Sequence, residues 1–242
     1  MSGNWRGSCI VSPNGGLVRR GNAKMKNKLL AILAVGIVTA SSAANAVPVT
    51  WTDWTSIGSN SASGTMGGVS VSVSSTNLMN GVSQTSCGTN FWTGTAYTNG
   101  SVSNGPTACE QVGLNSATTV TVTFSSAINT LYMALLSVGQ PNYTVTYDFD
   151  RAFVIDSEGQ GYWGNDVTNG VLGVGDTLAM QEFHGVLRFS APVTSLTFST
   201  APAEYWHAFT FGTATRVPEP GTLALLGLGL AGLGFAKRRK TA

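Results

Sequence analysis

The sequence predicts an all-β fold: an antiparallel sandwich or jelly-roll-like domain, flanked by an N-terminal signal helix and a C-terminal transmembrane helix. Two observations predict it. Apolar residues alternate with Ser and Thr along much of the chain, and clusters of Gly, Asn, Asp and Pro separate the alternating runs. Many short strands with frequent turns are typical of two packed sheets. We expect this domain to span residues 47–216, about 170 residues, which suits one hydrophobic core.

The alternating runs give the expected strands in order. Valines alternate with serines over residues 69–73, and apolar residues alternate with threonines over residues 120–124. The continuous apolar run at residues 131–138 favours a central strand or a short buried helix. Further strands are expected at residues 143–149, 152–155, 185–189, 196–198 and 209–211. Residues 56–107 are polar and rich in glycine, so we expect long loops there.

The expected domain is acidic, although the whole chain has a formal net charge of +2. Ten of the thirteen Lys and Arg residues lie at or before Lys28 or at or after Lys237. Residues 47–216 contain three basic and ten acidic residues, a net charge of −7. A domain of that charge repels phosphate backbones, so we expect no nucleic-acid partner.

The N-terminal region predicts export. A basic segment that begins at Met25 precedes an apolar segment at residues 29–38, which is too short to span a bilayer. An A-x-A cleavage motif follows, with Ala44 and Ala46 at its small positions, so cleavage is predicted to leave Val47 first.

We therefore interpret residues 25–46 as a signal peptide for the Sec export machinery and residues 1–24 as an upstream extension. The alternative is a long signal peptide that begins at Met1.

The cysteines agree with export. Cys9 lies in the segment to be removed, which leaves Cys87 and Cys109 as a pair around a loop rich in Gly, Asn and Thr. A disulfide between them is predicted to stabilise the domain by about 3 kcal/mol. Two unpaired thiols are the alternative.

Three features follow one another at the C-terminus. The first is a proline-containing box formed by Val217, Pro218, Glu219, Pro220, Gly221 and Thr222. An almost wholly apolar segment ends at Ala236, and a basic cluster runs from Lys237 to Lys240. As a helix the apolar segment is about 22 Å long, shorter than a ~30 Å hydrocarbon core. The positive-inside rule places the basic cluster in the cytoplasm.

These features, in this order over residues 217–242, resemble the PEP-CTERM sorting signal. The resemblance implies processing by an exosortase-type enzyme near Pro218 to Pro220. It also implies anchoring in the inner membrane before processing, delivery to the cell surface or outside the cell, and an association with exopolysaccharide and biofilm. An ordinary anchor with a proline-containing stalk explains the helix but not the box.

The sequence gives little support for catalysis, so we expect no enzyme. The two histidines, His184 and His207, fit no zinc-protease spacing, and no nucleophile-elbow or phosphate-loop motif occurs. Both histidines could share a metal with a carboxylate if the fold joins them, but separate structural histidines are the favoured interpretation.

No cofactor is predicted, with Ca²⁺ as the one candidate. The acidic residues Asp148, Asp150, Asp156, Glu158 and Asp166 lie on a glycine-interrupted stretch. Hard oxygen ligands on turns suit Ca²⁺, but the spacing fits no EF-hand, and solvated loop carboxylates are favoured.

Aromatic residues beside Gly or polar residues give the candidate ligand-binding site. Flat exposed rings stack on sugar faces, and nearby polar groups bind the hydroxyls. The candidate residues are Tyr162, Trp163, Glu182, His184, Trp206 and His207. The alternative places Trp163 and Trp206 in the core of the sandwich or at its rim.

The sequence therefore predicts an exported surface or matrix protein that acts by binding. It does not identify the ligand, for which extracellular polysaccharide is the candidate. The competing hypotheses are a secreted carbohydrate-active hydrolase that uses Glu182 or His184, and a purely structural matrix component.

Overall fold

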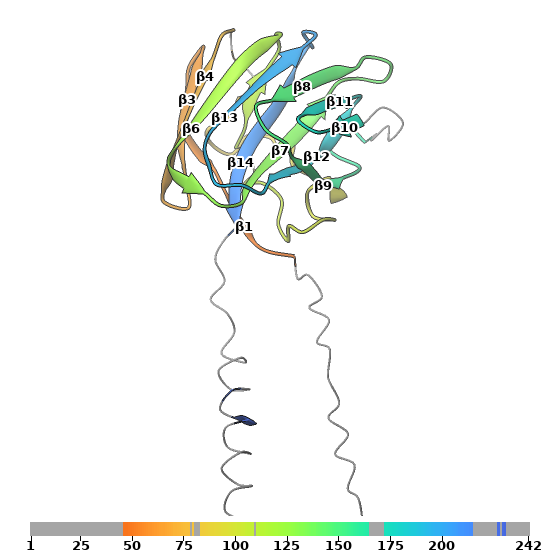
Figure 1. Ribbon diagram of the computed structural model, residues 1–242. Helices are drawn as coiled ribbons and strands as arrows, with labels where there is room; N and C mark the ends of the chain where they lie inside the picture. Colours follow the sequence, from red (N-terminus) through yellow and green to blue (C-terminus); the bar gives the residue numbers. More distant parts are fainter. Residues whose placement is uncertain are drawn as a thin grey trace, which may run out of the picture. The chain divides into compact units, whose positions relative to one another are not determined.

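The computed structural model describes residues 46–77, 79, 83–108, 110–164, 172–214, 227, 229 and 230. Between residues 46 and 214 the described chain forms fourteen β-strands and a short 3-10 helix, η1 (Thr95–Tyr97). The strands form two antiparallel sheets, one of six strands and one of eight, which pack as two layers (Figure 1). The predicted all-β sandwich is confirmed.

The order of strands differs from the order of the sequence in both sheets. The six-stranded sheet runs β1 (Val49–Trp51), β14 (His207–Ala214), β7 (Leu131–Val138), β12 (Phe183–Phe189) and β9 (Val154–Glu158), and β5 (Val112–Leu114) also pairs with β14. The eight-stranded sheet runs β10 (Leu172–Val174), β11 (Thr177–Met180), β8 (Val145–Phe149), β13 (Val193–Ala201), β6 (Thr118–Ile128), β4 (Val69–Ser75), β3 (Ser61–Met66) and β2 (Asp53–Ile57).

The main hydrophobic core lies between the two sheets. Strand β6 shows how the alternation builds it, because Val120 and Val122 are fully buried while Thr121 between them is partly buried and Thr119 and Thr123 on either side are exposed. Strand β8 places Tyr147 in the same core, where its ring stacks on Phe198 of β13 with centroids 5.2 Å apart. The alternating pattern therefore identified the inward face of these strands correctly.

Strand β7 is buried on both faces. Leu131 and Met133 belong to the main core, while Tyr132 and Ala134, on the opposite face, belong to a second core. A strand between two apolar layers has no reason to alternate. Of the two structures that the continuous apolar run favoured, the central strand is the one observed.

The second core covers the outer face of the six-stranded sheet. Residues 91–106, with η1, supply Trp92, Ala96, Tyr97 and Val102 to it. The indole N–H of Trp92 donates to the carbonyl of Glu110 at 3.1 Å. This segment is a loop, as expected, but it forms a buried apolar layer.

The expectation of long loops throughout residues 56–107 is wrong for its first part. Strands β3 and β4 both lie wholly within that range and pair with the register Met66↔Val69, and the alternation over residues 69–73 had indicated β4. Strand β3 alternates Ser and Thr with Ala62, Gly64 and Met66, of which only Met66 is a large apolar side chain. The hydrophobic contrast is too small to indicate a strand, although the residues pair in register.

Glu110 is a buried carboxylate between the main core and the outer layer. One of its oxygens accepts the backbone N–H of Trp54 at 2.8 Å. Burial raises the pKa of Glu110 above its ordinary value, the Trp54 hydrogen bond partly opposes this, and the nearby charge of Asp53 adds to it. The folded state therefore retains the carboxyl proton of Glu110 to a higher pH than the unfolded chain does.

Glu110→Gln is expected to reduce the decrease in the free energy of unfolding between acid and neutral pH. As pH rises from about 4, the unfolded chain releases the Glu110 proton first, so the free energy of unfolding falls in the wild type. Glutamine keeps an oxygen for the Trp54 N–H and carries no charge, so the variant loses less stability. Urea denaturation at about pH 4 and pH 7 measures the difference; parallel changes in both proteins contradict the prediction.

Candidate functional site

A pocket of about 240 Å³ opens where β7 ends and β12 begins. Four segments that lie far apart in the sequence form its walls: the end of β7 with the following turn, the segment after β9, the start of β12, and residues 204–206 before β14. Its lining residues are Ser137, Gln140, Pro141, Trp163, Glu182, Glu204, Tyr205 and Trp206.

The pocket is built on an irregular part of the sheet. Phe183 pairs with Val138 and Gly185 pairs with Leu135, so Leu136 and Ser137 together face His184 across a bulge. Ser137 and Glu182 both have a backbone φ of +51°, a conformation that costs a non-glycine residue about 1 kcal/mol or more. Their side chains join, since the Ser137 hydroxyl donates to Glu182 Oε1 at 2.7 Å. The bulge therefore holds the Glu182 carboxylate at the pocket.

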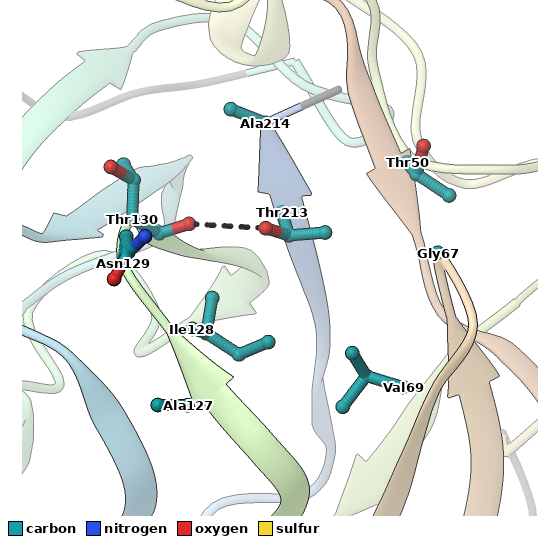
Figure 2. A pocket seen from close by; sticks show the side chains of 9 residues that line it. All are labelled: Thr50, Gly67, Val69, Ala127, Ile128, Asn129, Thr130, Thr213 and Ala214. Atoms are coloured by element: carbon teal, nitrogen blue, oxygen red, sulfur yellow. Dashed lines mark hydrogen bonds between the residues drawn. The ribbon is translucent and has the colours of Figure 1, made fainter. Parts of the chain in front are cut away.

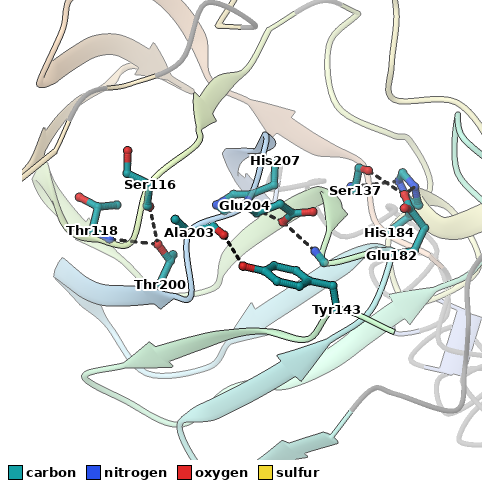
Figure 3. A network of polar contacts seen from close by, with 11 residues as sticks. Ser116, Thr118, Ser137, Tyr143, Glu182, His184, Thr200, Ala203, Glu204 and His207 are labelled. Atoms are coloured by element: carbon teal, nitrogen blue, oxygen red, sulfur yellow. Dashed lines mark hydrogen bonds and ion pairs between the residues drawn. The ribbon is translucent and has the colours of Figure 1, made fainter. Parts of the chain in front are cut away.

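His184 supports Glu182 from behind. The imidazole is fully buried; Nδ1 accepts the backbone N–H of Ser137 at 3.4 Å and lies 3.1 Å from the Tyr97 hydroxyl. Burial, with a smaller contribution from Glu182, raises the pKa of Tyr97 well above its ordinary value, so the phenol keeps its proton. The Tyr97 hydroxyl donates to the Leu135 carbonyl at 3.3 Å. Because Nδ1 accepts the Ser137 N–H, the ring proton of His184 is assigned to Nε2, which lies 3.3 Å from Glu182 Oε1 but has no hydrogen-bond partner among the described residues. Figure 3 shows Ser137, Glu182 and His184 as one group.

The space above His184 is closed by Gly161. A Cβ atom added to Gly161 would lie 2.2 Å from the ring atoms Cγ and Nδ1 of His184. Beyond it, the ring of Trp163 is nearly parallel to the imidazole, with centroids 6.3 Å apart. His184 is therefore a supporting residue that a ligand in the pocket does not reach.

Glu204 and His207 form a second pair (Figure 3). Glu204 Oε2 accepts the Gly139 N–H at 2.8 Å and lies 2.9 Å from His207 Nδ1. Both side chains are buried, and His207 Nε2 has no hydrogen-bond partner among the described residues. The Nδ1–H tautomer satisfies this arrangement. His207 thus lies in the interior, whereas Glu204 also lines the pocket.

The structure does not gather the candidate metal ligands. Each histidine faces its own glutamate, and within the described ranges no group of three His, Cys, Asp or Glu side chains is placed to hold a metal ion. Asp156 of the acidic stretch is buried and accepts hydrogen bonds from Ser101 Oγ at 2.6 Å and Arg188 Nε at 3.1 Å. Asp166 lies outside the described residues, so the expectation of solvated loop carboxylates, with Ca²⁺ binding as the alternative, is untested.

Aromatic rings surround the pocket, and two of them, Phe91 and Trp206, are partly buried against the second core. We define the aromatic cluster as Phe91, Tyr162, Trp163 and Trp206. The ring centroids of Trp163 lie 4.5 Å from Trp206, 4.6 Å from Tyr162 and 5.1 Å from Phe91. Trp163 is 40% exposed and Tyr162 46% exposed, and Tyr205 beside them is 83% exposed. The main core therefore does not contain Trp163, which lies at the rim of the pocket.

The structure thus brings four of the six candidate ligand-binding residues together at one surface: Tyr162, Trp163, Glu182 and Trp206. His184 and His207 are buried behind that surface. Sequence reasoning missed Phe91, Ser137 and Glu204. Only Glu204 had a local signal, because it immediately precedes Tyr205 and Trp206.

A second pocket of about 500 Å³ offers less chemistry (Figure 2). It lies among β1, the β3–β4 turn, the β6–β7 turn and the end of β14. Its lining residues are Thr50, Gly67, Val69, Ala127, Ile128, Asn129, Thr130, Thr213 and Ala214. They include no titratable side chain and no aromatic ring, so this pocket has no group for acid–base chemistry or for stacking.

The predicted disulfide is untested. Cys87 is exposed to solvent and forms no disulfide with a described residue, and its Sγ lies 3.3 Å from the carbonyl oxygen of Ala108. Cys109 lies outside the described residues, so its pairing with Cys87 stays a prediction.

The terminal signals also fall largely outside the described residues. Of the cleavage region, Ala46 and Val47 are described, and the backbone N–H of Val47 donates to Ser101 at 2.7 Å. Ala44 and the box at residues 217–222 are not described. Gly227, Gly229 and Leu230 are helical and exposed. Across the part of the chain that the structure describes, no helix has the length and apolar character needed to cross a membrane.

Comparison with known proteins identifies the C-terminal segment. Neither a curated protein nor a solved structure matches the chain. A family model described as the PEP-CTERM protein-sorting motif matches residues 216–240. The chain therefore carries a PEP-CTERM sorting motif, which implies export, anchoring in a membrane and processing by an exosortase-type enzyme.

Proposed function

We propose that the β-sandwich is a binding component of the cell surface or extracellular matrix and that it holds extracellular polysaccharide at the aromatic cluster. The observation that carries this proposal is the pocket in which Trp163 and Trp206 stand beside Glu182. The apolar face of a pyranose ring stacks on such exposed rings, while polar groups at the pocket bind its hydroxyls. Gln140 and Glu182 supply those groups.

The chemistry of the pocket favours binding over turnover. His184 is fully buried under Gly161, and its Nδ1 faces a backbone N–H, so it presents no base to a ligand. The Ser137 hydroxyl donates to Glu182 rather than to the imidazole, so the pocket lacks the serine–histidine pair of a triad-type nucleophile.

The sorting motif supports the location of this function. Export through the Sec machinery, followed by exosortase processing, delivers the domain to the cell surface or beyond, where exopolysaccharide and biofilm matrix are found. The net charge of −7 over residues 47–216 gives no attraction to nucleic acid. The domain works there without a catalytic cofactor.

A secreted carbohydrate-active hydrolase is the second candidate. The observation that favours it is the presence of two carboxylates, Glu182 and Glu204, in one pocket, because glycosidases use a pair of carboxylates. In this reading Glu182→Gln abolishes a measurable hydrolysis of polysaccharide.

A glycan array tests the proposal directly. The full-length protein, solubilised in detergent and fluorescently labelled, is expected to retain a defined subset of glycans and to leave them uncleaved. Retention without selectivity supports a structural matrix component instead. Release of cleaved sugars that stops in Glu182→Gln supports the hydrolase.

A further inference from the structure

The pocket contains two carboxylates, and none of its lining residues is basic. Apart from the histidine rings, the groups that donate hydrogen bonds to these carboxylates are uncharged. The Ser137 hydroxyl donates to Glu182, and the Gly139 backbone N–H donates to Glu204. A hydroxyl or an amide orients a carboxylate but does not neutralise it. The walls of the pocket therefore leave its negative charge uncompensated.

The two histidines contact the glutamates but lie behind the pocket and do not line it. A second proton on His184 would lie on Nδ1, which is 3.4 Å from the backbone nitrogen of Ser137 and 3.1 Å from the Tyr97 hydroxyl. A second proton on His207 would lie on Nε2, which is buried and has no hydrogen-bond acceptor among the described residues. The placement on His207 buries an unsatisfied N–H, which is costly.

The described arginines are engaged elsewhere in the domain. Arg151 donates to Asp150 at 3.1 Å and to the carbonyl of Ser195 at 2.8 Å. Arg188 donates to Asp156 at 3.1 Å. Neither arginine lines the pocket, so a cation that enters it meets no like charge from these side chains.

The aromatic walls add a second attraction for cations. Trp163, Tyr205 and Trp206 line the same pocket as the two glutamates. The negative face of an aromatic ring attracts an ammonium group, and Trp does so most strongly. Carboxylates together with aromatic faces are the combination that recognises an organic cation.

We infer that the pocket selects a polysaccharide that contains amino sugars with a free ammonium group, such as de-N-acetylated glucosamine. The inference rests on the proposed function and names its ligand class. The ammonium group enters between Glu182, Glu204 and the ring of Trp163, while the apolar face of the sugar lies on the aromatic cluster. An N-acetyl group carries no positive charge, so it loses the attraction of the two carboxylates and of the Trp163 ring. It is also larger than an ammonium group.

The dimensions of the site favour a sugar over a lysine side chain. A volume of about 240 Å³ is smaller than that of pockets that enclose drug-sized ligands, and it suits one sugar unit. The cluster continues outside the pocket through Phe91 and Tyr162, whose centroids lie 5.1 Å apart. That surface gives neighbouring sugar rings of a polymer a place to stack, whereas a single lysine would use the pocket alone.

Isothermal titration of the full-length protein in detergent tests the inference. The probes are a β-1,4-linked glucosamine hexamer, the matching N-acetylglucosamine hexamer and a lysine hexapeptide, at about 0.15 M salt to screen long-range attraction. The glucosamine hexamer is expected to bind about tenfold or more tightly than the N-acetylated hexamer. Glu182→Gln, which keeps an acceptor for Ser137, is expected to remove this preference. Asp148→Asn, which removes an exposed carboxylate on β8 outside the pocket, keeps it.

The outcomes separate this inference from the proposed function. Equal binding of the two hexamers overturns the ammonium preference and leaves polysaccharide binding in place. Equal weakening by Glu182→Gln and Asp148→Asn shows general electrostatic attraction and also overturns it. Tighter binding of the lysine hexapeptide overturns the sugar assignment. If neither hexamer binds a protein that retains other glycans on the array, the inference alone fails; if the array is also blank, the proposed function fails with it. A thermal melt of each variant checks that it is folded.

Discussion

Replacing Trp54 with alanine is expected to destabilise the folded domain by about 3–5 kcal/mol. Trp54 is fully buried in β2 and belongs to the core between the sheets. Its indole N–H donates to Thr210 Oγ1 of β14, in the opposite sheet, at 3.1 Å. Alanine therefore leaves a large cavity and removes the partner of a buried hydroxyl. Urea denaturation monitored by circular dichroism measures the change.

Two further variants separate the volume of the ring from its hydrogen bond. Trp54→Phe keeps most of the buried ring but cannot donate to Thr210, so it is expected to lose less stability than Trp54→Ala. Thr210→Val removes the hydroxyl while keeping a β-branched side chain, and combined with Trp54→Phe it leaves no buried donor or acceptor without a partner at this position. A loss below about 1 kcal/mol for Trp54→Ala contradicts this account of the core.

The sandwich could be predicted from the sequence because its inner strands show strong contrast between their two faces. In β6, Val120 and Val122 alternate with threonines, and in β8, Val145 and Tyr147 do the same. Strand β3 could not be predicted in this way, because its inward residues include Ala62 and Gly64. Its place depends on pairing with β2 and β4, which is long-range information that a local pattern does not contain.

The candidate site was only half predictable for a similar reason. Trp163 and Trp206 stand beside glycine or polar residues, which is a local sign of exposure. Ser137 has no such sign, because it lies in an apolar run and reaches Glu182, 45 positions away, through a bulge in the pairing of β7 with β12. Its positive φ also contradicts the ordinary preference of serine. Such local disagreement with the pattern is expected at sites that bind or react.

Trp163→Ala is expected to weaken the binding of the glycans retained on the array by about thirtyfold or more, the effect of a central aromatic contact at an interface. The ring touches Phe91, Tyr162 and Trp206, so its loss removes the centre of the aromatic cluster. Because the side chain is 40% exposed, the free energy of unfolding is expected to change by less than about 1 kcal/mol. Titration with a retained glycan and a urea melt of the same sample measure the two effects.

Trp163→Phe is the matched control, because phenylalanine restores a flat apolar face without the indole nitrogen. If stacking carries the binding, this variant recovers a large part of the affinity that alanine loses. Substitution by alanine thus has different consequences at the two tryptophans: at Trp54 it lowers the stability of the fold, and at Trp163 it lowers the affinity for glycans. A Trp163→Ala protein that unfolds easily yet binds its glycans normally would place Trp163 among the structural residues and remove the aromatic cluster from the binding site.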